Sequence, residues 1–215
     1  MIPGAGGSAA YWHRVVPELN ARGHEAIAVD LPAEDDSAGL AKYADVVAEA
    51  LAGSEEVIIV AQSMGGFTAP LVCDRLPVSQ IVLVNAMIPA PGERPGEWWE
   101  NTGQEAARRE LDAREGRDPD APFDPFVYFL HDVAPEVIES LGPPPDQSDT
   151  PFEWPWPLDA WPDVPTRAVA GRDDRFFPVE FQRRVAQERL GITPEVLPGG
   201  HLLALARPKE LAELL

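Results

Sequence analysis

The sequence predicts an α/β fold, in which a mostly parallel sheet carries helices on both faces. Short apolar runs rich in β-branched residues, typical of buried strands, recur along the 215-residue chain. Segments with helical spacing of apolar residues lie between them, and strands that alternate with helices form parallel sheets. The length fits one domain, or one domain with a small insert.

The first part of the chain supplies three predicted strands and two predicted helices. Ser37 or Asp36 is a suitable cap for the first helix, and Pro77 stops the second. The expected strands are Glu25–Asp30, Val57–Ala61 and Ile81–Val84, and the expected helices are Ser37–Leu51 and Gly65–Leu76.

The last part of the chain continues the same alternation. Strands are expected at Arg167–Ala170 and Glu195–Leu197, and helices at Pro178–Leu190 and Pro208–Leu215. Proline fits the first turn of a helix, and Gly191 lies just past the end of the longer one. Functional sites of such sheets lie at the carboxyl ends of the strands, so the residues after each strand are the ones to inspect.

The middle of the chain differs in composition. Fifteen of the 24 prolines lie between Pro89 and Pro165, together with five of the six tryptophans. This indicates an irregular, aromatic insert within a regular core. The predicted division is a core of residues 1–86 and 162–215, and a cap of residues 87–161.

Charge and composition exclude several classes of partner. The net charge of -19 leaves no basic cluster for nucleic acid or for an anionic membrane surface. No run of 18 apolar residues and no signal peptide is visible, and the single cysteine, Cys73, cannot form an internal disulfide. We therefore expect a cytoplasmic protein, a monomer or homodimer, that acts on a small neutral molecule.

The strongest motif follows the second predicted strand. Ser63 lies between Gln62 and Met64, with Ala61 and Gly65 two residues to either side. Small-x-Ser-x-Gly between a strand and a helix is the pattern of a nucleophile elbow, where the strained turn demands small flanking residues. The alternative, a turn that uses the serine only as a helix cap, is not excluded by this hexapeptide alone.

A nucleophilic serine needs a base and an acid that orients it, and both follow later strands. Asp174 lies after the fourth strand and His201 after the fifth, in the chain order Ser, Asp, His expected for this architecture. We prefer Asp174 to Asp173 because it lies three residues after Gly171 and four before a proline.

The other histidines fit the base less well. Among His13, His24, His131 and His201, only His201 follows a late strand in a glycine turn. Asn85 ends the third strand, where an acid could also lie, but an amide cannot stabilise an imidazolium as a charge.

The glycine-rich start of the chain can supply the second oxyanion donor. The predicted pair of donors is the backbone N–H of Ala5 and that of Met64, because glycines beside Ala5 let the backbone approach a ligand closely. No Gly-Lys-Ser/Thr follows, so a phosphate loop is excluded. Neither His-x-x-x-His nor Cys-x-x-Cys occurs, so no metal and no cofactor are expected.

Four stretches together resemble the α/β-hydrolase fold family. The family's oxyanion loop is resembled by Ile2 to Ser8 with Tyr11-Trp12, where Pro3 replaces the usual histidine. Its nucleophile elbow is resembled by the turn at Ser63, its acid loop by Gly171–Pro178 and its base loop by Gly199–His201. The branch most similar is that of small esterases related to plant methyl esterases and hydroxynitrile lyases. The resemblance implies a single cap inserted after strand Ile81–Val84.

One departure from the family lies at the start of the chain. Only Met1 and Ile2 precede Pro3, whereas a typical strand has about 5–6 residues. We therefore expect a truncated first strand and a poorly held Ala5 donor, as a misassigned start or a trimmed fragment would give.

These residues predict a serine hydrolase that cleaves a carboxylic ester or thioester through an acyl-enzyme. His201 takes the proton of Ser63, and Asp174 fixes the tautomer of His201. Two alternatives stay open: a non-catalytic ligand-binding protein of the same fold, and a hydroxynitrile-lyase-type enzyme. The lyase chemistry needs a cationic group near the serine, and the only lysines of the sequence, Lys42 and Lys209, are not obviously placed to supply it. The expected substrate pocket lies in the cap and comprises Trp98, Trp99, Phe126, Phe129 and His131.

Overall fold

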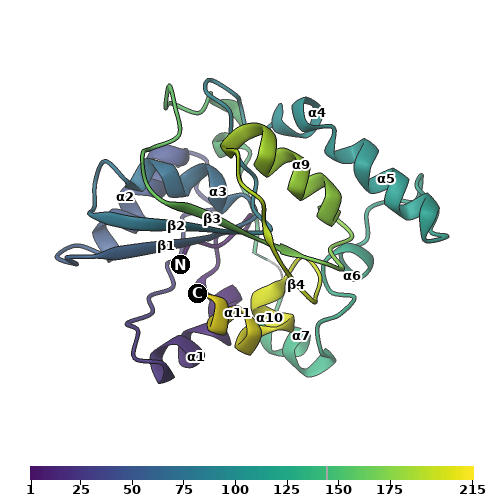
Figure 1. The fold of residues 1–215 in the computed structure, drawn as a ribbon, viewed down its shortest axis with the longest axis horizontal. Coiled ribbons are helices and arrows are strands. Elements are labelled where there is room, and N and C mark those ends of the chain that lie inside the picture. Colours follow the sequence, from purple (N-terminus) through teal and green to yellow (C-terminus); the bar gives the residue numbers. More distant parts are fainter. Residues whose placement is uncertain (144) are drawn as a thin grey trace.

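The computed structural model describes residues 1–143 and 145–215 and contains a parallel sheet of four strands in the described chain. The strand order is β1-β2-β3-β4, and each strand pairs with the next in parallel (Figure 1). The strands are β1 (Val57–Gln62), β2 (Val78–Val84), β3 (Thr166–Gly171) and β4 (Glu195–Leu197). Four predicted strands and their parallel arrangement are thereby confirmed.

The sheet separates two apolar cores because successive side chains of a strand point to opposite faces. Ile59, Ile81 and Leu83 belong to a core formed with α2, α3 and α9. Val60 and Val82 belong to the opposite core, formed with α1, α10 and α11. Figure 1 shows these helices on the two faces of the sheet, as the α/β prediction requires. The core helices are α1 (Val15–Ala21), α2 (Leu40–Ala50), α3 (Gly65–Thr68), α9 (Val179–Leu190), α10 (Leu203–Ala206) and α11 (Pro208–Leu214), with 3-10 turns η1 (Ala9–Trp12) and η2 (Ala69–Val72).

The predicted strand Glu25–Asp30 is absent. Among the described residues, its backbone pairs with the backbone of the first residue: the Met1 amine donates to Ile27 O (2.6 Å) and the Val29 N–H donates to Met1 O (3.1 Å). A strand needs a continuous ladder of such bonds, and a single partner residue does not supply one. The prediction was therefore wrong about the strand, although Val29 is buried as its apolar pattern indicates.

Two predicted helices differ from the observed ones at their ends. The first begins at Leu40 with Gly39 at the N-cap, because the Ser37 side chain hydrogen-bonds to Asp35 instead of capping the helix. The second was predicted to run to Leu76 but α3 ends at Thr68 and a 3-10 turn follows. Pro70 explains this break, since proline lacks an N–H and disfavours the α conformation of the residue before it.

The middle segment, residues 87–161, is more helical than its composition suggested. It contains α4 (Trp98–Thr102), α5 (Gln104–Arg114), α6 (Pro125–Tyr128), α7 (Pro135–Leu141) and α8 (Thr150–Glu153). The expectation of an irregular insert missed these helices, three of which carry proline in the first turn, but long loops connect them.

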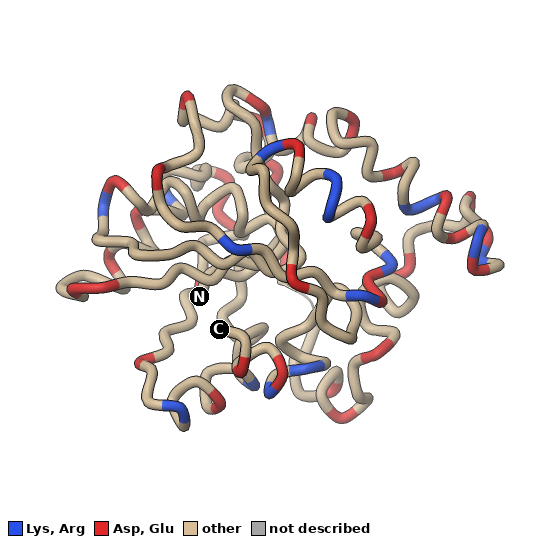
Figure 2. Tube along the Cα trace, in the orientation of Figure 1, with Lys and Arg blue, Asp and Glu red and all other residues tan. Residues whose placement is uncertain are grey.

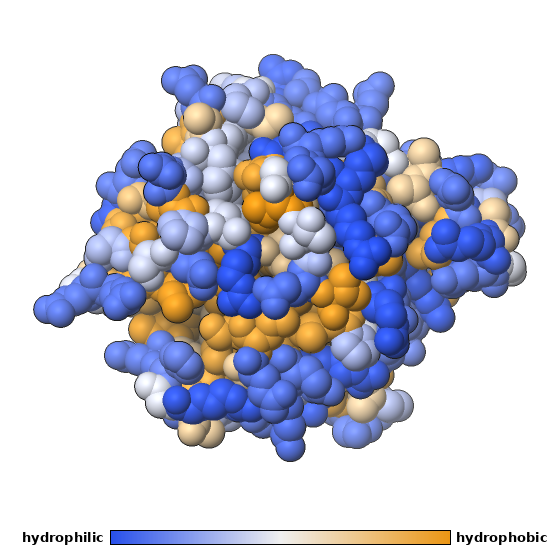
Figure 3. Space-filling view, viewed as in Figure 1, coloured by the Kyte–Doolittle hydropathy of each residue, from blue (hydrophilic) through white to orange (hydrophobic). Residues whose placement is uncertain are grey.

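Acidic residues outnumber basic ones, 36 to 17, along the chain. Figure 2 shows the basic residues scattered along the chain among more numerous acidic ones. Figure 3 shows hydrophobic residues at the surface between the sheet and α11. Leu197, Leu214 and Leu215 are partly buried hydrophobic residues packed against the core on this face of the sheet. Within the described residues, no helix is both long enough and apolar enough to cross a membrane.

Candidate active site

Ser63 lies in a strained turn between β1 and α3. Its φ of 49° places a residue with a side chain in the left-handed region, which is uncommon outside glycine. The turn is tightly packed: a Cβ on Gly65 would lie 2.7 Å from Pro3 O, and one on Gly66 would lie 1.9 Å from Met87 O. The predicted elbow is therefore present. Any side chain at Gly65 or Gly66 would clash with a backbone oxygen, so these positions require glycine.

Ser63, His201 and Asp174 form one hydrogen-bonded chain. The Oγ of Ser63 lies 3.3 Å from Nε2 of His201, and Nδ1 of His201 lies 2.8 Å from Oδ2 of Asp174. His201 and Asp174 are 2% and 1% exposed, whereas Ser63 is less deeply buried. The structure thus brings the three predicted residues together from the ends of three different strands.

The carboxylate of Asp174 is held in a fixed orientation. Its Oδ1 accepts the backbone N–H groups of Phe176 and Phe177, both at 2.8 Å, and Gln182 donates to its Oδ2 at 3.3 Å. These bonds leave Oδ2 directed at the imidazole of His201. Gln182 lies in α9 and was not singled out in the sequence, where nothing distinguishes it from other polar helix residues.

Asp173, the weaker candidate for the acid, points away from His201. It pairs with Arg172 at 3.0 Å, and its Oδ2 accepts the N–H of Gly199 at 3.0 Å. The hydrogen bond from Arg172 lowers the pKa of Asp173 below its usual value. Asp173 therefore joins the acid loop to the base loop, and Asp174 is the one in contact with the imidazole.

Asn85 fastens both loops to the end of β2. Its Nδ2 donates to Gly200 O (3.0 Å) and His201 O (2.9 Å), and its Oδ1 accepts the N–H of Gly171 (2.6 Å). It is fully buried with a φ of 44°. The sequence showed only a polar residue at the end of an apolar strand, and its role in holding the base loop was missed.

The glycine-rich loop lies against the elbow. Ile2 bridges to Ala61 of β1, through bonds from Ile2 N–H to Val60 O (2.7 Å) and from Gln62 N–H to Ile2 O (3.1 Å). A Cβ on Gly4 would lie 2.9 Å from Cβ of Ser63. The first strand is thus reduced to this single bridge at Ile2, as expected, and the N–H of Gly7 donates to Gly4 O (3.1 Å) across the turn that contains Ala5.

The two predicted oxyanion donors are available. No described residue accepts a hydrogen bond from the N–H of Ala5 or of Met64. The neighbouring N–H of Gly6 is bound by Oε1 of Gln147 at 2.9 Å, so the middle segment contacts this loop. Gln147 was not among the residues singled out in the sequence.

Aromatic rings surround the imidazole of His201. Phe129 stacks on it with centroids 5.0 Å apart, and Phe176 and Phe177 contact it edge-on at 5.3 and 4.9 Å. Phe129 was predicted to lie at the site. Phe176 and Phe177 were not, although their place directly after the acid was a usable signal.

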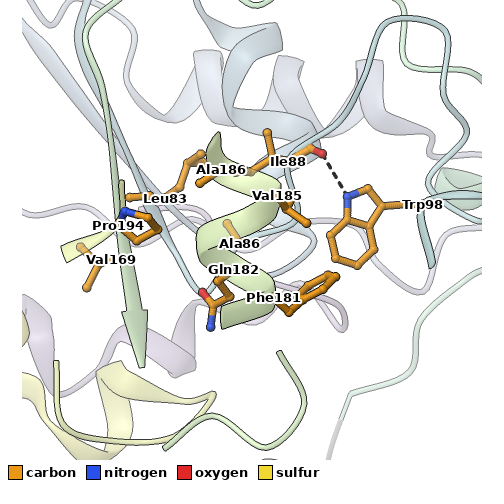
Figure 4. A pocket seen from close by; sticks show the side chains of 11 residues that line it. Leu83, Ala86, Ile88, Trp98, Val169, Phe181, Gln182, Val185, Ala186 and Pro194 are labelled. Atoms are coloured by element: carbon orange, nitrogen blue, oxygen red, sulfur yellow. Dashed lines mark hydrogen bonds between the residues drawn. The ribbon is translucent and has the colours of Figure 1, made fainter. Parts of the chain in front are cut away.

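The remaining predicted pocket residues lie farther from the triad. Trp98 is fully buried and beside a cavity of about 10 Å³, its indole N–H donating to Ile88 O (Figure 4). Its ring lies 5.3 Å from that of Phe177, which in turn contacts His201. Trp99 packs on Phe176, and Phe126 is 64% exposed. Trp98 is thus a core residue, and Phe126 does not line an enclosed pocket here.

His131 lies behind the base loop. A Cβ on Gly200 would meet His131 Nε2 at 2.7 Å and Asp132 Oδ1 at 2.8 Å. Burial lowers the pKa of His131 below its usual value, and Arg175 lowers it further, against opposing effects of Asp132 and Asp174. His131 also borders a cavity of about 720 Å³ between α5 and the start of α9.

Comparison with known proteins places these features in a family. The model of the alpha/beta hydrolase family matches residues 1–214. Methylesterase 3 of Arabidopsis thaliana is 30% identical over 51% of this chain, and the match covers 47% of that protein, so the chain spans about half the length of this relative. Pyrethroid hydrolase of Sphingobium wenxiniae is 29% identical, over 99% of this chain and 84% of that protein.

Solved structures show the same fold. The structure of polyneuridine aldehyde esterase superimposes with a TM-score of 0.77 at 21% identity, covering 99% of this chain and 95% of that chain. The family match confirms the resemblance inferred from the four motifs, and the plant methylesterase agrees with the predicted branch. The chain belongs to the alpha/beta hydrolase family.

Proposed function

We propose that this protein hydrolyses carboxylic esters through an acyl-enzyme formed on Ser63. The observation that carries the proposal is the chain of contacts from Ser63 Oγ to His201 (3.3 Å) and from His201 to Asp174 (2.8 Å). A serine held this way, with two nearby loop N–H groups that no described residue binds, has the parts required for acyl transfer.

In the proposed reaction, Nε2 of His201 accepts the Ser63 proton as Oγ attacks the ester carbonyl. Asp174 keeps the other imidazole proton on Nδ1 and stabilises the imidazolium. The N–H groups of Ala5 and Met64 hold the oxyanion. His201 then gives its proton to the leaving alcohol, and water hydrolyses the acyl-enzyme with His201 again as base.

The surroundings favour a neutral ester with an apolar part. Phe129, Phe176 and Phe177 make the space beside His201 apolar, and a net charge of -19 does not attract anionic substrates. Relatives named methylesterase and pyrethroid hydrolase support ester cleavage. We also propose that residues 87–161 act as a cap over this site, and residues 1–86 and 162–215 as the core.

A panel of neutral esters and thioesters of increasing acyl length tests this proposal. The wild type is expected to hydrolyse at least one ester class, and Ser63→Ala is expected to lose that activity by about 10⁴-fold or more. Ser140→Ala, which removes a hydroxyl of α7 away from the triad, serves as the matched control and is expected to retain activity. Equal activity of Ser63→Ala and the wild type would contradict the proposal.

A further inference from the structure

A second polar contact from the middle segment reaches the base loop. Oδ2 of Asp132 accepts the N–H of Gly200 at 2.7 Å, directly before His201 in the chain. We infer that Asp132 is a positioning residue for the proposed hydrolysis: its carboxylate fixes the peptide that precedes His201 and thereby holds the imidazole in reach of Ser63. This inference rests on the proposed function.

The peptides around His201 are fixed from three parts of the chain. Asn85 binds Gly200 O and His201 O from the end of β2, at 3.0 and 2.9 Å. Asp173 accepts the N–H of Gly199 from the acid loop at 3.0 Å, and Asp132 accepts the N–H of Gly200 from the middle segment. Asp132 is therefore the link through which the placement of the middle segment affects the backbone of the base.

The same stretch of chain also contacts the imidazole itself. Phe129, three residues before Asp132, stacks on the His201 ring with an interplanar angle of 25°. Gly200 has no room for a side chain, because a Cβ would lie within 2.8 Å of both His131 and Asp132. Residues 129–132 thus hold both the ring and the backbone next to it.

The second oxygen of Asp132 makes no competing hydrogen bond among the described residues. Oδ1 is buried and has no hydrogen-bond partner among the described residues. A buried carboxylate oxygen without a partner is unfavourable for folding. In the part of the chain that the structure describes, the Gly200 N–H is therefore the hydrogen-bond donor to this carboxylate, through Oδ2.

The test measures kcat and KM for Asp132→Ala and Asp132→Asn with the best substrate of the ester panel. We expect Asp132→Ala to lower kcat by about 100-fold, the effect of displacing a catalytic group by about 1 Å, with KM changed less than about twofold. Asp132→Asn is expected to stay within about threefold of the wild type, because the amide oxygen still accepts the Gly200 N–H.

The control is Asp124→Ala, which removes an aspartate of the same segment. Asp124 caps α6 by accepting the Phe126 N–H, so it affects the segment without a known contact to the base loop. It is expected to leave kcat unchanged. If Asp132→Ala does not fold, Asp132→Glu, which displaces the carboxylate by one methylene, is expected to fold and to show the reduced kcat.

Phosphonate labelling separates failure of this inference from failure of the proposed function. A wild type that is not labelled at Ser63 would refute the hydrolase proposal itself. A labelled wild type with unchanged kcat in Asp132→Ala would overturn only the inference about Asp132. An equal loss of kcat in the alanine and asparagine variants, or in Asp124→Ala, would also overturn it.

Discussion

At the scale of single residues, the site depends on buried polar groups whose partners are backbone atoms. Asn85 is the clearest case, since it joins β2 to the acid loop and the base loop through four hydrogen bonds to backbone and Gln182. The Asn85 side chain is fully buried. If it were removed, the backbone groups that it binds would have no water molecule to replace the lost hydrogen bonds. Such residues determine whether three separate loops can meet.

Asn85→Gly isolates these bonds, because glycine adopts the φ of 44° without strain. We expect the free energy of unfolding to fall by about 3 kcal/mol, since each buried group left without a partner costs about 1–3 kcal/mol. Denaturant titration measures this free energy of unfolding in the wild type and the variant. Asn20→Gly, which removes an exposed bond to Ala26 N–H, is the control and should cost about 1 kcal/mol. Equal losses in the two variants would contradict the assignment.

His131 predicts a pH effect on stability. Its pKa is lowered in the folded protein, first by burial and then by Arg175, relative to about 6.5 in an unfolded chain. The unfolded state therefore binds more protons, and the free energy of unfolding falls as the pH drops below about 6.5. Denaturation of wild type and His131→Gln at pH 5 to 7.5 should show a shallower dependence in the variant. The same pH dependence of the free energy of unfolding in the wild type and His131→Gln would refute this role of His131.

At the scale of elements, the middle segment is fastened to the core through α9. Arg189 of α9 makes a two-pronged contact with Glu93, whose side chain is 4% exposed. Burial would raise the pKa of Glu93, but hydrogen bonds from Arg189 and Asn101 outweigh it and lower the pKa. This pair fixes the start of the segment, while Gln147 and Asp132 contact the oxyanion loop and the base loop farther along.

Glu93→Gln leaves the charge of Arg189 without its counterion. We expect a loss of about 3 kcal/mol in the free energy of unfolding, as found when one partner of a buried pair is removed. Glu97→Gln breaks the exposed pair with Arg94 and should change stability by less than about 1 kcal/mol. Urea denaturation measures the free energy of unfolding of both variants. Similar losses in Glu93→Gln and Glu97→Gln would show that the Glu93–Arg189 pair stabilises the protein no more than a surface pair does.

Gln147 links the segment to the oxyanion loop. Gln147→Met has nearly the same size but cannot accept the Gly6 N–H. We expect kcat for the best ester to fall by about 10-fold, less than the 10²–10³ caused by losing a donor outright, because Ala5 is displaced rather than removed. KM should change little. Gln187→Met, at an exposed position of α9, is the control and should leave kcat unchanged. An unchanged kcat in Gln147→Met would show that the oxyanion loop keeps its conformation without Gln147.

At the scale of the whole molecule, local patterns predicted the sheet and the chemistry at its carboxyl edge. Strands β1 to β4 and the residues Ser63, Asp174 and His201 were found because each follows from periodicity or from a motif at a strand end. The predicted strand at 25–30 failed because strand formation depends on a partner, which no local pattern reveals. The contacts of Asn85, Asp132 and Gln147 were missed because they join segments distant in sequence, and the contact of Gln182 with Asp174 was missed because no motif distinguishes this glutamine from other polar helix residues.

The central claim is that Ser63 is the nucleophile of a hydrolase. The most direct measurement is mass spectrometry of peptides after incubation with a fluorophosphonate, which captures an activated serine covalently. The account predicts one phosphonyl group on Ser63 in the wild type and none in Ser63→Ala. An unlabelled wild type, or a label that persists elsewhere in Ser63→Ala at the same rate, would contradict it and favour a ligand-binding protein of this fold.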